Sequence, residues 1–245
     1  LSRSAGSRLH TGQLVSDVVP DETGVDLAVL DVRTRKLARY RADAVILAAP
    51  KFVAAKLLRP WRESAPEHVR AFTYGAWFVA NLHLSKRPRS KGHELAWDNV
   101  LYDSPSLGYV VATHQRLRDR GPTIFTYYQP LLEPDPARAR SRLSELQHAD
   151  FCDAILADLN RAHADLEECV ERIDVWRWGH AMVRPVPGFI WGGARQKAMA
   201  PFGRVHFAHS DLSGLALFEE AQDRGVRAAE SVLAARGRAF DSLLG

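Results

Sequence analysis

The chain has 245 residues, of which 46% are hydrophobic and 25% are charged, a composition typical of a folded globular protein. This length suits one large domain or two small ones and allows a sizeable buried core. The formal net charge is +4, but basic and acidic residues alternate without a basic block, so we expect no nucleic-acid partner. No apolar run approaches the roughly 18 residues of a membrane span.

The two cysteines, Cys152 and Cys169, lie in helical patterns without partners at metal-ligand spacing. Reduced thiols in a reducing compartment are the simplest interpretation. Because no signal peptide is recognisable, we expect a cytoplasmic protein. The histidines are also scattered, and we expect no metal site. The chain begins with Leu1 rather than Met, which is compatible with a processed piece of a longer polypeptide.

Short β patterns occupy the first fifty residues. Runs rich in β-branched residues at 13–19 and 24–32 are separated by a Pro-Asp-Glu-Thr turn cluster. A continuous apolar run at 44–49 ends at Pro50 and is typical of a strand buried on both faces in a layered α/β fold. One or two helical turns are expected to follow it.

Aromatic-rich strands dominate the middle of the chain. They follow one another through short connections, which favours an antiparallel sheet. One long helix is then predicted from apolar residues at helical spacing between Leu143 and Leu166, with Asp150, Asp153 and Asp158 on its solvated side. A strand from Cys169 is expected to lead into a loop rich in proline and tryptophan.

A strand, a polar turn and a helix end the chain. The apolar run 205–208 is followed by His209, Ser210 and Asp211, and then by a helical pattern. The first N–H groups of a helix lack partners, so such a turn can bind an anion or a polar ring. A helix cap at Ser213 is the simpler alternative. The consecutive His-Ser-Asp residues do not predict a catalytic triad, since triad members meet by folding.

Three stretches resemble the FAD-dependent amine oxidase superfamily, which includes monoamine and polyamine oxidases, protoporphyrinogen oxidase and phytoene desaturases. Residues 203–233, GRVHFAHSDLSGLALFEEAQDRGVRAAESVL, resemble its C-terminal flavin-binding segment. Residues 41–50, RADAVILAAP, resemble its Ala-Asp-x-Val-Ile-x-Ala-x-Pro strand. Val15 and Val18 in LVSDVV resemble its Val-x-x-Ile strand. The three matches occur in the family's order.

The resemblance implies an α/β fold of α+β character with two domains. An incomplete Rossmann-like FAD-binding domain is expected at 1–58 and 200–245, and a substrate-binding domain with an antiparallel sheet and helices at 59–199. FAD is the implied cofactor and a small molecule the implied substrate. The residues expected to contact FAD are Val15, Ala49, Pro50, Ser210, Asp211, Leu212, Ser213 and Gly214. The residues expected to face the substrate are Trp178, His180 and Trp191, with a packed aromatic cluster as the alternative.

Within that implied site, Asp211 is expected near the ribityl and pyrophosphate groups, and the N–H groups of 212–215 near the flavin ring. The sequence departs from the family pattern in three places. It lacks the fingerprint G-x-G-x-x-G, so we expect the C-terminal part of a longer flavoprotein. The family's lysine on the first substrate-domain strand is replaced by Val79 or Asn81. The stretch AHSD has one extra residue, so either Ser210 or Asp211 takes the acidic position.

Two functions are compatible with these features. The first is oxidation of a C–N or C–C bond by hydride transfer to flavin, in a longer parent enzyme. The second is a non-catalytic module or fold remnant that does not bind FAD on its own. Enzyme activity of this chain by itself, its catalytic residues and a homodimeric state are left open.

Overall fold

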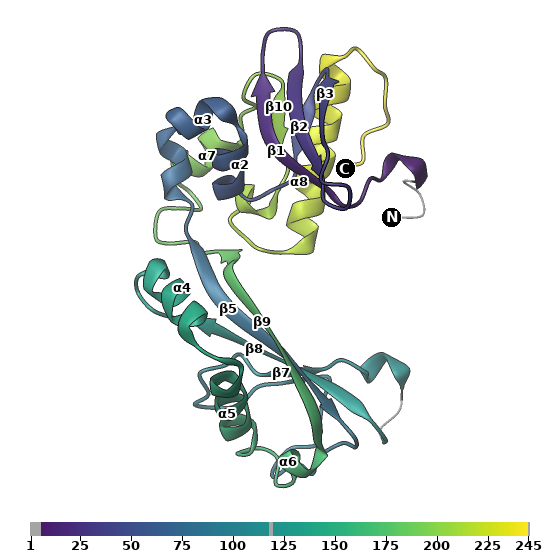
Figure 1. The fold of residues 1–245 in the computed structure, drawn as a ribbon. Helices are drawn as coiled ribbons and strands as arrows, with labels where there is room; N and C mark the ends of the chain where they lie inside the picture. The colour runs from purple at the N-terminus through teal and green to yellow at the C-terminus, as the bar shows by residue number, and fades with distance from the viewer. Residues whose placement is uncertain (1–5, 118–119, 245) are drawn as a thin grey trace. The chain divides into compact units, whose positions relative to one another are not determined.

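The computed structural model describes residues 6–117 and 120–244. The chain forms two compact units: unit 1 combines Leu1–Thr73 with Val183–Gly245, and unit 2 is Tyr74–Met182. Both units combine helices with sheets (Figure 1), which confirms the predicted α/β class. The domain boundaries expected at residues 58 and 200 stay a prediction.

Unit 1 begins after a short 3-10 helix, η1 (Gly6–Arg8), with an antiparallel sheet whose three strands follow one another in chain order. They are β1 (Gln13–Pro20), β2 (Val25–Asp31) and β3 (Leu37–Ala42). β1 carries a bulge between Val15 and Asp17. The buried carboxylate of Asp17 pairs with Arg59 and Arg62. Arg62 also donates to the carbonyl of Ser16 at 2.7 Å, so both arginines hold the bulge in place.

A second sheet of unit 1 joins two distant parts of the chain. It consists of β4 (Val45–Leu47) and β10 (Val205–Phe207), which pair in parallel. The carboxyl ends of parallel neighbours lie at the same edge of a sheet. Leu47 is buried, but Ile46 is 40% exposed. The expected burial of both faces of β4 is therefore wrong for the face that Ile46 occupies.

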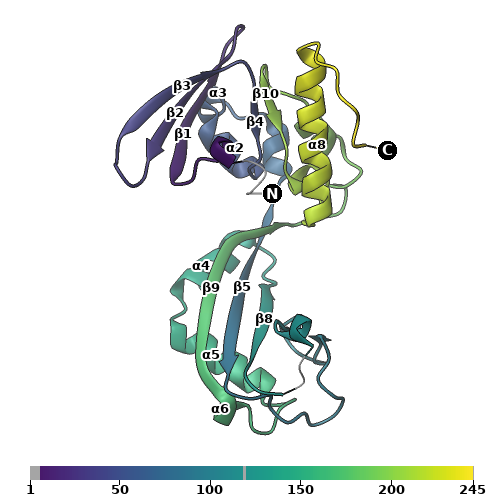
Figure 2. The same ribbon diagram turned by 90° about the vertical axis from the view of Figure 1, so that its right-hand side faces the viewer.

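The helices of unit 1 pack around these strands, and Figure 2 shows the longest, α8, alongside β10. The predicted helical turns after Pro50 are confirmed. The helices are α2 (Lys51–Leu57), α3 (Arg59–Glu63), α7 (Gly193–Met199) and α8 (Phe218–Ala235), with the 3-10 helices η2 (Glu67–Ala71) and η4 (Ser210–Leu212). Ala228 is the most buried residue of α8. Its small side chain lets this helix pack closely against the rest of unit 1.

Unit 2 is built on an antiparallel sheet with the strand order β6-β7-β8-β5-β9, as predicted. Its strands are β5 (Tyr74–Leu84), β6 (Asp98–Asn99), β7 (Tyr109–Val111), β8 (Thr123–Leu131) and β9 (Val170–Val183). β9 extends as far as Val183, and the proline-containing segment follows it, in agreement with the predicted order of strand and loop.

The single long helix predicted for unit 2 is wrong. Helices α4 (Pro136–Glu145), α5 (His148–Leu159) and α6 (Leu166–Cys169) take its place, and a 3-10 turn, η3 (His114–Arg116), precedes β8. The break follows from capping. Leu146 is extended, and Gln147 and Asp150 form a reciprocal capping box that starts α5.

Alternate residues of β5 form the core of unit 2. Ala76, Phe78, Ala80 and Leu82 are buried and belong to a cluster with residues of β8, α4 and α5, including Phe151. The intervening positions of β5 are only half-buried. The sheet of unit 2 therefore has one face packed on helices and one open face, as its period-2 pattern requires.

Candidate functional site

The parallel pair β4 and β10 brings together segments that lie at opposite ends of the sequence. The turn after β4 contains Ala49 and Pro50, and the turn after β10 runs from His209 to Gly214. All the predicted cofactor residues except Val15 thus lie in two turns at the carboxyl edge of one sheet. Open α/β sheets bind ligands at this edge.

Asp211 connects the two turns. Its side chain is almost completely buried, and its Oδ2 accepts a hydrogen bond from the main-chain N–H of Lys51 at 2.9 Å. Its Oδ1 lies 3.0 Å from Nδ1 of His209. Ser210 contributes its carbonyl, which accepts bonds from the N–H groups of Ser213 and Gly214. Asp211, rather than Ser210, therefore supplies the carboxylate that holds the turns together.

Lys51 is a buried amine that the sequence did not single out. Its side chain is 2% exposed, and its Nζ lies 3.1 Å from the ring centroid of Phe207 and 5.6 Å from that of Trp61. Nζ has no hydrogen-bond partner among the described residues. Burial lowers the pKa of Lys51 to about 7, against the opposing attraction of Asp211. Only its position in the apolar stretch AAPKFVAA hinted at this burial.

The sequence suggested that the long helix starts at the turn 210–214, but the structure places its start further along the chain. The turn forms η4, and α8 begins at Phe218, with Leu217 as a cap residue whose side chain makes no capping bond. Ser213 does not cap α8 either, because its hydroxyl accepts a bond from Nε of Arg224 at 2.9 Å. The N–H groups of 212–214 are bonded to carbonyls of 209–211. They are therefore not free donors, and the expected helix terminus lies several residues further along.

Close packing also fixes Gly214. Its φ is +76°, and a side chain here would collide with Ile190 and Phe189. Arg195 donates to the carbonyls of Ile190 at 2.7 Å and Leu212 at 2.8 Å. The turn is thus tied to the segment that precedes and begins α7, and only glycine fits this backbone position without strain.

Val15 lies on the other sheet of unit 1, where it pairs with Val29 next to the β1 bulge. A parallel bridge between Val18 and Leu58 connects β1 with the end of α2. Main-chain contact of Val15 with a cofactor stays a prediction.

The open face of the sheet in unit 2 is rich in aromatic residues. Trp176 and Trp178 on β9 are 43% and 53% exposed, which is unlike a packed core cluster. The ring of His180 meets that of Tyr74 edge-on at 5.9 Å. Trp191 is placed differently, since it belongs to unit 1 and is 89% exposed in the segment before α7. Trp178 and His180 therefore lie on the same strand of unit 2, whereas Trp191 belongs to unit 1.

The position of the missing family lysine is also on β5. Val79 and Asn81 both occupy half-buried positions of the strand. Asn81 accepts a hydrogen bond from the hydroxyl of Thr126 at 2.8 Å. Further along β5, Nε2 of His83 lies 2.9 Å from the carboxylate of Asp174. At this part of β5 the side chains of Val79 and Asn81 are uncharged, and the polar side chains of Asn81 and His83 are both hydrogen-bonded to neighbouring strands.

Comparison with protein families identifies the chain. A family model described as flavin containing amine oxidoreductase matches residues 1–233. The chain belongs to this family. No curated protein sequence matches the chain.

Solved structures agree on the fold. Wild-type putrescine oxidase bound to putrescine is 18% identical with a TM-score of 0.68, covering 95% of this chain and 51% of that one. Cyclohexylamine oxidase from Brevibacterium oxydans IH-35A is 16% identical with a TM-score of 0.64, covering 92% and 49%. The chain spans about half the length of these proteins, and identities this low show a common fold only.

The residues present fit part of an FAD site. The carboxyl edge of a parallel pair and the buried Lys51 amine suit a polar ligand, whereas the N–H groups of 212–214 are already bonded within their turn. A glycine-rich loop for the pyrophosphate is absent from the sequence. Over residues 6–117 and 120–244, no cluster of three metal-ligating side chains occurs, and no helix is long and apolar enough to cross a membrane.

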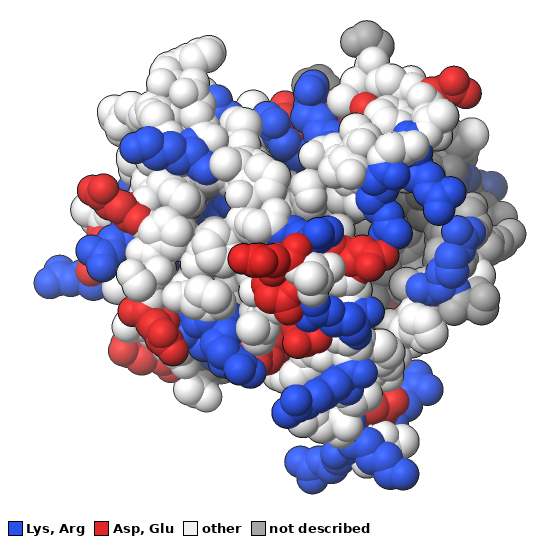
Figure 3. Space-filling view, turned by 90° about the horizontal axis from the view of Figure 1, so that it is seen from above, with Lys and Arg blue, Asp and Glu red and all other residues white. Residues whose placement is uncertain are grey.

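Charges of both signs are interspersed on the face drawn in Figure 3, where Lys and Arg side chains lie among Asp and Glu side chains. The expected lack of a nucleic-acid partner stays a prediction.

Proposed function

We propose that this chain contributes the cofactor-facing turns and the substrate sheet of a flavin-dependent oxidoreductase that oxidises a C–N or C–C bond of a small molecule. Membership of the flavin containing amine oxidoreductase family supports this proposal. The observation that carries it is the bond between Lys51 and Asp211, which joins the turns at the carboxyl edge of β4 and β10. FAD, when bound, supplies the hydride acceptor.

In this proposal the residues of unit 1 hold and orient the cofactor. Ala49 and Pro50 contribute main-chain groups beside it, and Asp211 keeps their turn in register with Ser213 and Gly214. Val15 contributes main-chain contacts from β1. A dinucleotide-binding segment outside this chain binds the pyrophosphate, in keeping with the half-length coverage of similar structures.

The open face of unit 2 binds the substrate in this proposal. Trp176 and Trp178 offer apolar surface that excludes water. Hydride removal needs a substrate carbon about 3–3.5 Å from the acceptor and no protein nucleophile. Since Val79 and Asn81 carry no charge where the family has a lysine, the proposal includes C–C as well as C–N bonds.

A second candidate is a non-catalytic module that does not hold FAD by itself. The engaged N–H groups of 212–214 favour it, because they are not available to bind a cofactor. Both candidates predict weak FAD binding by the isolated chain. They differ in the flavin content that they predict for the longer polypeptide.

The two candidates are separated by flavin content. The isolated chain is titrated with FAD by fluorescence, and the longest natural polypeptide that contains this sequence is purified and examined for flavin absorbance. We expect weak binding by the chain and stoichiometric flavin in the longer polypeptide. A longer polypeptide without flavin would contradict the oxidoreductase proposal, and tight binding by the chain alone would exclude the module. A homodimer and a cytoplasmic location also stay proposals, for sedimentation and cell fractionation to test.

A further inference from the structure

Unit 2 contains a cavity of about 550 Å³ that the flavin proposal does not use. It lies between the end of β8 and the helices α4 and α5. Phe78, Leu131, Leu146 and Phe151 form its apolar lining. This volume is typical of sites for small organic ligands, which are mainly apolar with a few fixed polar groups.

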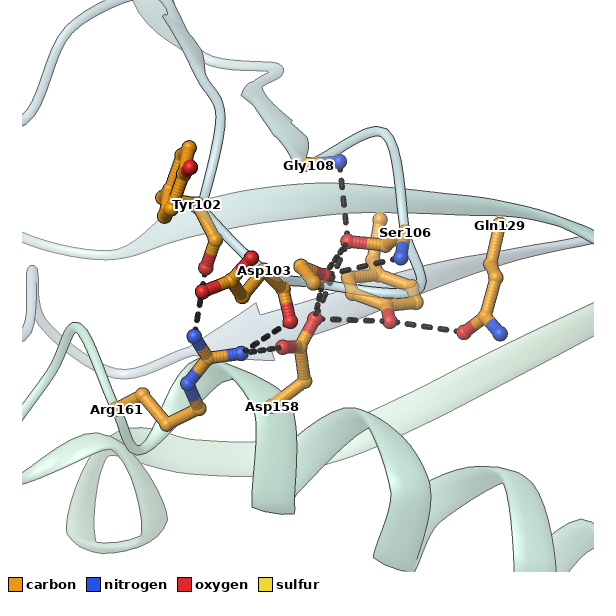
Figure 4. Close-up of polar contacts among 9 residues, drawn as sticks. Tyr102, Asp103, Ser106, Gly108, Gln129, Asp158 and Arg161 are labelled. Atoms are coloured by element: carbon orange, nitrogen blue, oxygen red, sulfur yellow. Dashed lines mark hydrogen bonds and ion pairs between the residues drawn. The ribbon is translucent and has the colours of Figure 1, made fainter.

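A buried carboxylate fixes two parts of the cavity wall. Asp158, near the end of α5, accepts hydrogen bonds from the hydroxyls of Ser104 at 2.6 Å and Ser106 at 3.1 Å, as Figure 4 shows for the network as a whole. These serines flank Pro105, which lines the cavity. Asp158 also accepts from Tyr127, whose hydroxyl lies 3.0 Å from Oε1 of Gln129, another lining residue.

The network also determines what Gln129 presents to the cavity. Burial raises the pKa of Tyr127, so its hydroxyl keeps a single proton. The carboxylate of Asp158 is the stronger of the two acceptors near that proton. The structure has Oε1 of Gln129 facing this hydroxyl. We place the amide a half-turn from that orientation, because its Nε2 can then donate to the hydroxyl oxygen and its carbonyl oxygen is left for a ligand.

The charges at the cavity are predominantly negative. Arg142 pairs with Glu133 at 2.8 Å, so these two lining residues neutralise each other. Asp150 also lines the cavity, and one of its oxygens accepts the main-chain N–H of Gln147. No Lys or Arg forms an ion pair with Asp150 within the described ranges 6–117 and 120–244. The cavity therefore offers acceptors and one negative charge, that of the helix-capping Asp150, which no Lys or Arg of the described residues neutralises.

From these features we infer that the cavity binds an organic cation, a protonated amine on an apolar body. The hydrocarbon part fills the space lined by Phe78, Leu131 and Phe151, and the ammonium group donates to Gln129 and lies near Asp150. Charge complementarity selects this ligand over a carboxylate of the same size. The Asp158 network holds Pro105 and Gln129 in place before the ligand arrives.

Two probes with one hydrocarbon body and opposite charges test the inference. Isothermal titration calorimetry compares 4-phenylbutylamine with 4-phenylbutyrate on the unmodified chain without flavin. We expect the amine to bind about three to five times more tightly, the gain expected from a partly exposed charge. Asp150→Asn should remove this preference. Asp153→Asn, on the same helix but outside the cavity lining, should leave it unchanged.

Two exposed lining positions allow the cavity itself to be altered. Ala154→Trp fills the cavity from α5, and Leu132→Arg, at a side chain that is 76% exposed, reverses the charge at its mouth. Ala154→Trp should abolish binding of both probes, and Leu132→Arg should weaken amine binding even if the first variant does not fold. Equal affinities for the two probes would overturn the inference. So would amine binding that survives these changes but is lost in Trp178→Ala, because the amine would then occupy the open sheet face. Neither result depends on flavin, so the proposed oxidoreductase function is tested separately.

Discussion

The main-chain N–H of Lys51 donates to Oδ2 of Asp211 at 2.9 Å, although 160 residues separate the two in the chain. The bond closes the carboxyl edge of a parallel pair whose strands, β4 and β10, have three residues each. So short a pair has few ladder bonds of its own. A buried charge-assisted bond is therefore an important constraint on how the two turns meet.

Replacement of Asp211 should separate these turns. In Asp211→Ala the buried N–H of Lys51 loses its acceptor, and we expect the free energy of unfolding to fall by about 1–3 kcal/mol. Asp211→Asn keeps an acceptor oxygen and should lose less. Urea denaturation followed by circular dichroism measures both, with the exposed Asp153→Asn as a control. Equal stability of the alanine variant and the unmodified chain would show that the bond is dispensable.

Removal of the buried amine should stabilise the chain and alter its pH dependence. The pKa of Lys51 is about 7 in the folded state against 10.5 for an unperturbed lysine. Between these values the unfolded state binds more protons than the folded state, so the free energy of unfolding rises with pH. Below pH 7 the full cost of burying the ammonium group is present, roughly 5 kcal/mol at most. Lys51→Met should remove both the cost and the slope.

The exposed Lys56 on the same helix is the matched control for this experiment. Lys56→Met should leave the rise in stability between pH 7 and 10 intact. Urea midpoints measured across this range are sufficient to compare the two variants. A slope that persists in Lys51→Met would mean that another group causes it.

Glycine-to-alanine changes should have opposite effects at two positions of unit 1. Gly214 has a φ of +76° and no room for a side chain beside Ile190, so Gly214→Ala should destabilise by more than about 1 kcal/mol. Gly225 lies inside α8 with open space around it. Gly225→Ala should stabilise by about 0.5–1 kcal/mol because alanine is the better helix former. Thermal unfolding measures both, and the same sign for the two variants would refute the assignment of strain to Gly214.

Local patterns were sufficient to predict much of unit 1. The apolar run before Pro50 became β4 and the run before His209 became β10, because burial imposes a readable periodicity on strands. The start of α8 was misplaced. Ser213 and Gly214 have the composition of a helix entry, but the side chain of Arg224 captures the Ser213 hydroxyl. This contact depends on tertiary packing, which local sequence does not encode.

Buried polar groups were the other source of error. Asp158 was assigned to a solvated helix face, yet it is buried because Ser104, Ser106 and Tyr127 supply donors from distant segments. Lys51 was overlooked because the residues next to it in the sequence do not indicate that its amine lies against the rings of Trp61 and Phe207. A charged residue is normally exposed unless it is paired. The donors around Asp158 and the aromatic rings around Lys51 come from other segments, so neither burial can be read from local sequence.

The Asp158 network gives the last prediction, which concerns unit 2. Asp158→Ala removes the carboxylate that accepts from the buried hydroxyls of Ser106 and Tyr127, and we expect a loss of about 3 kcal/mol in the free energy of unfolding. Arg161 also pairs with Asp158, at 3.1 Å, but its side chain is 47% exposed. Arg161→Ala should therefore cost about 1 kcal/mol or less. Thermal unfolding compares the two, and an equal loss in both variants would mean that the ion pair, rather than the hydroxyl network, stabilises this part of unit 2.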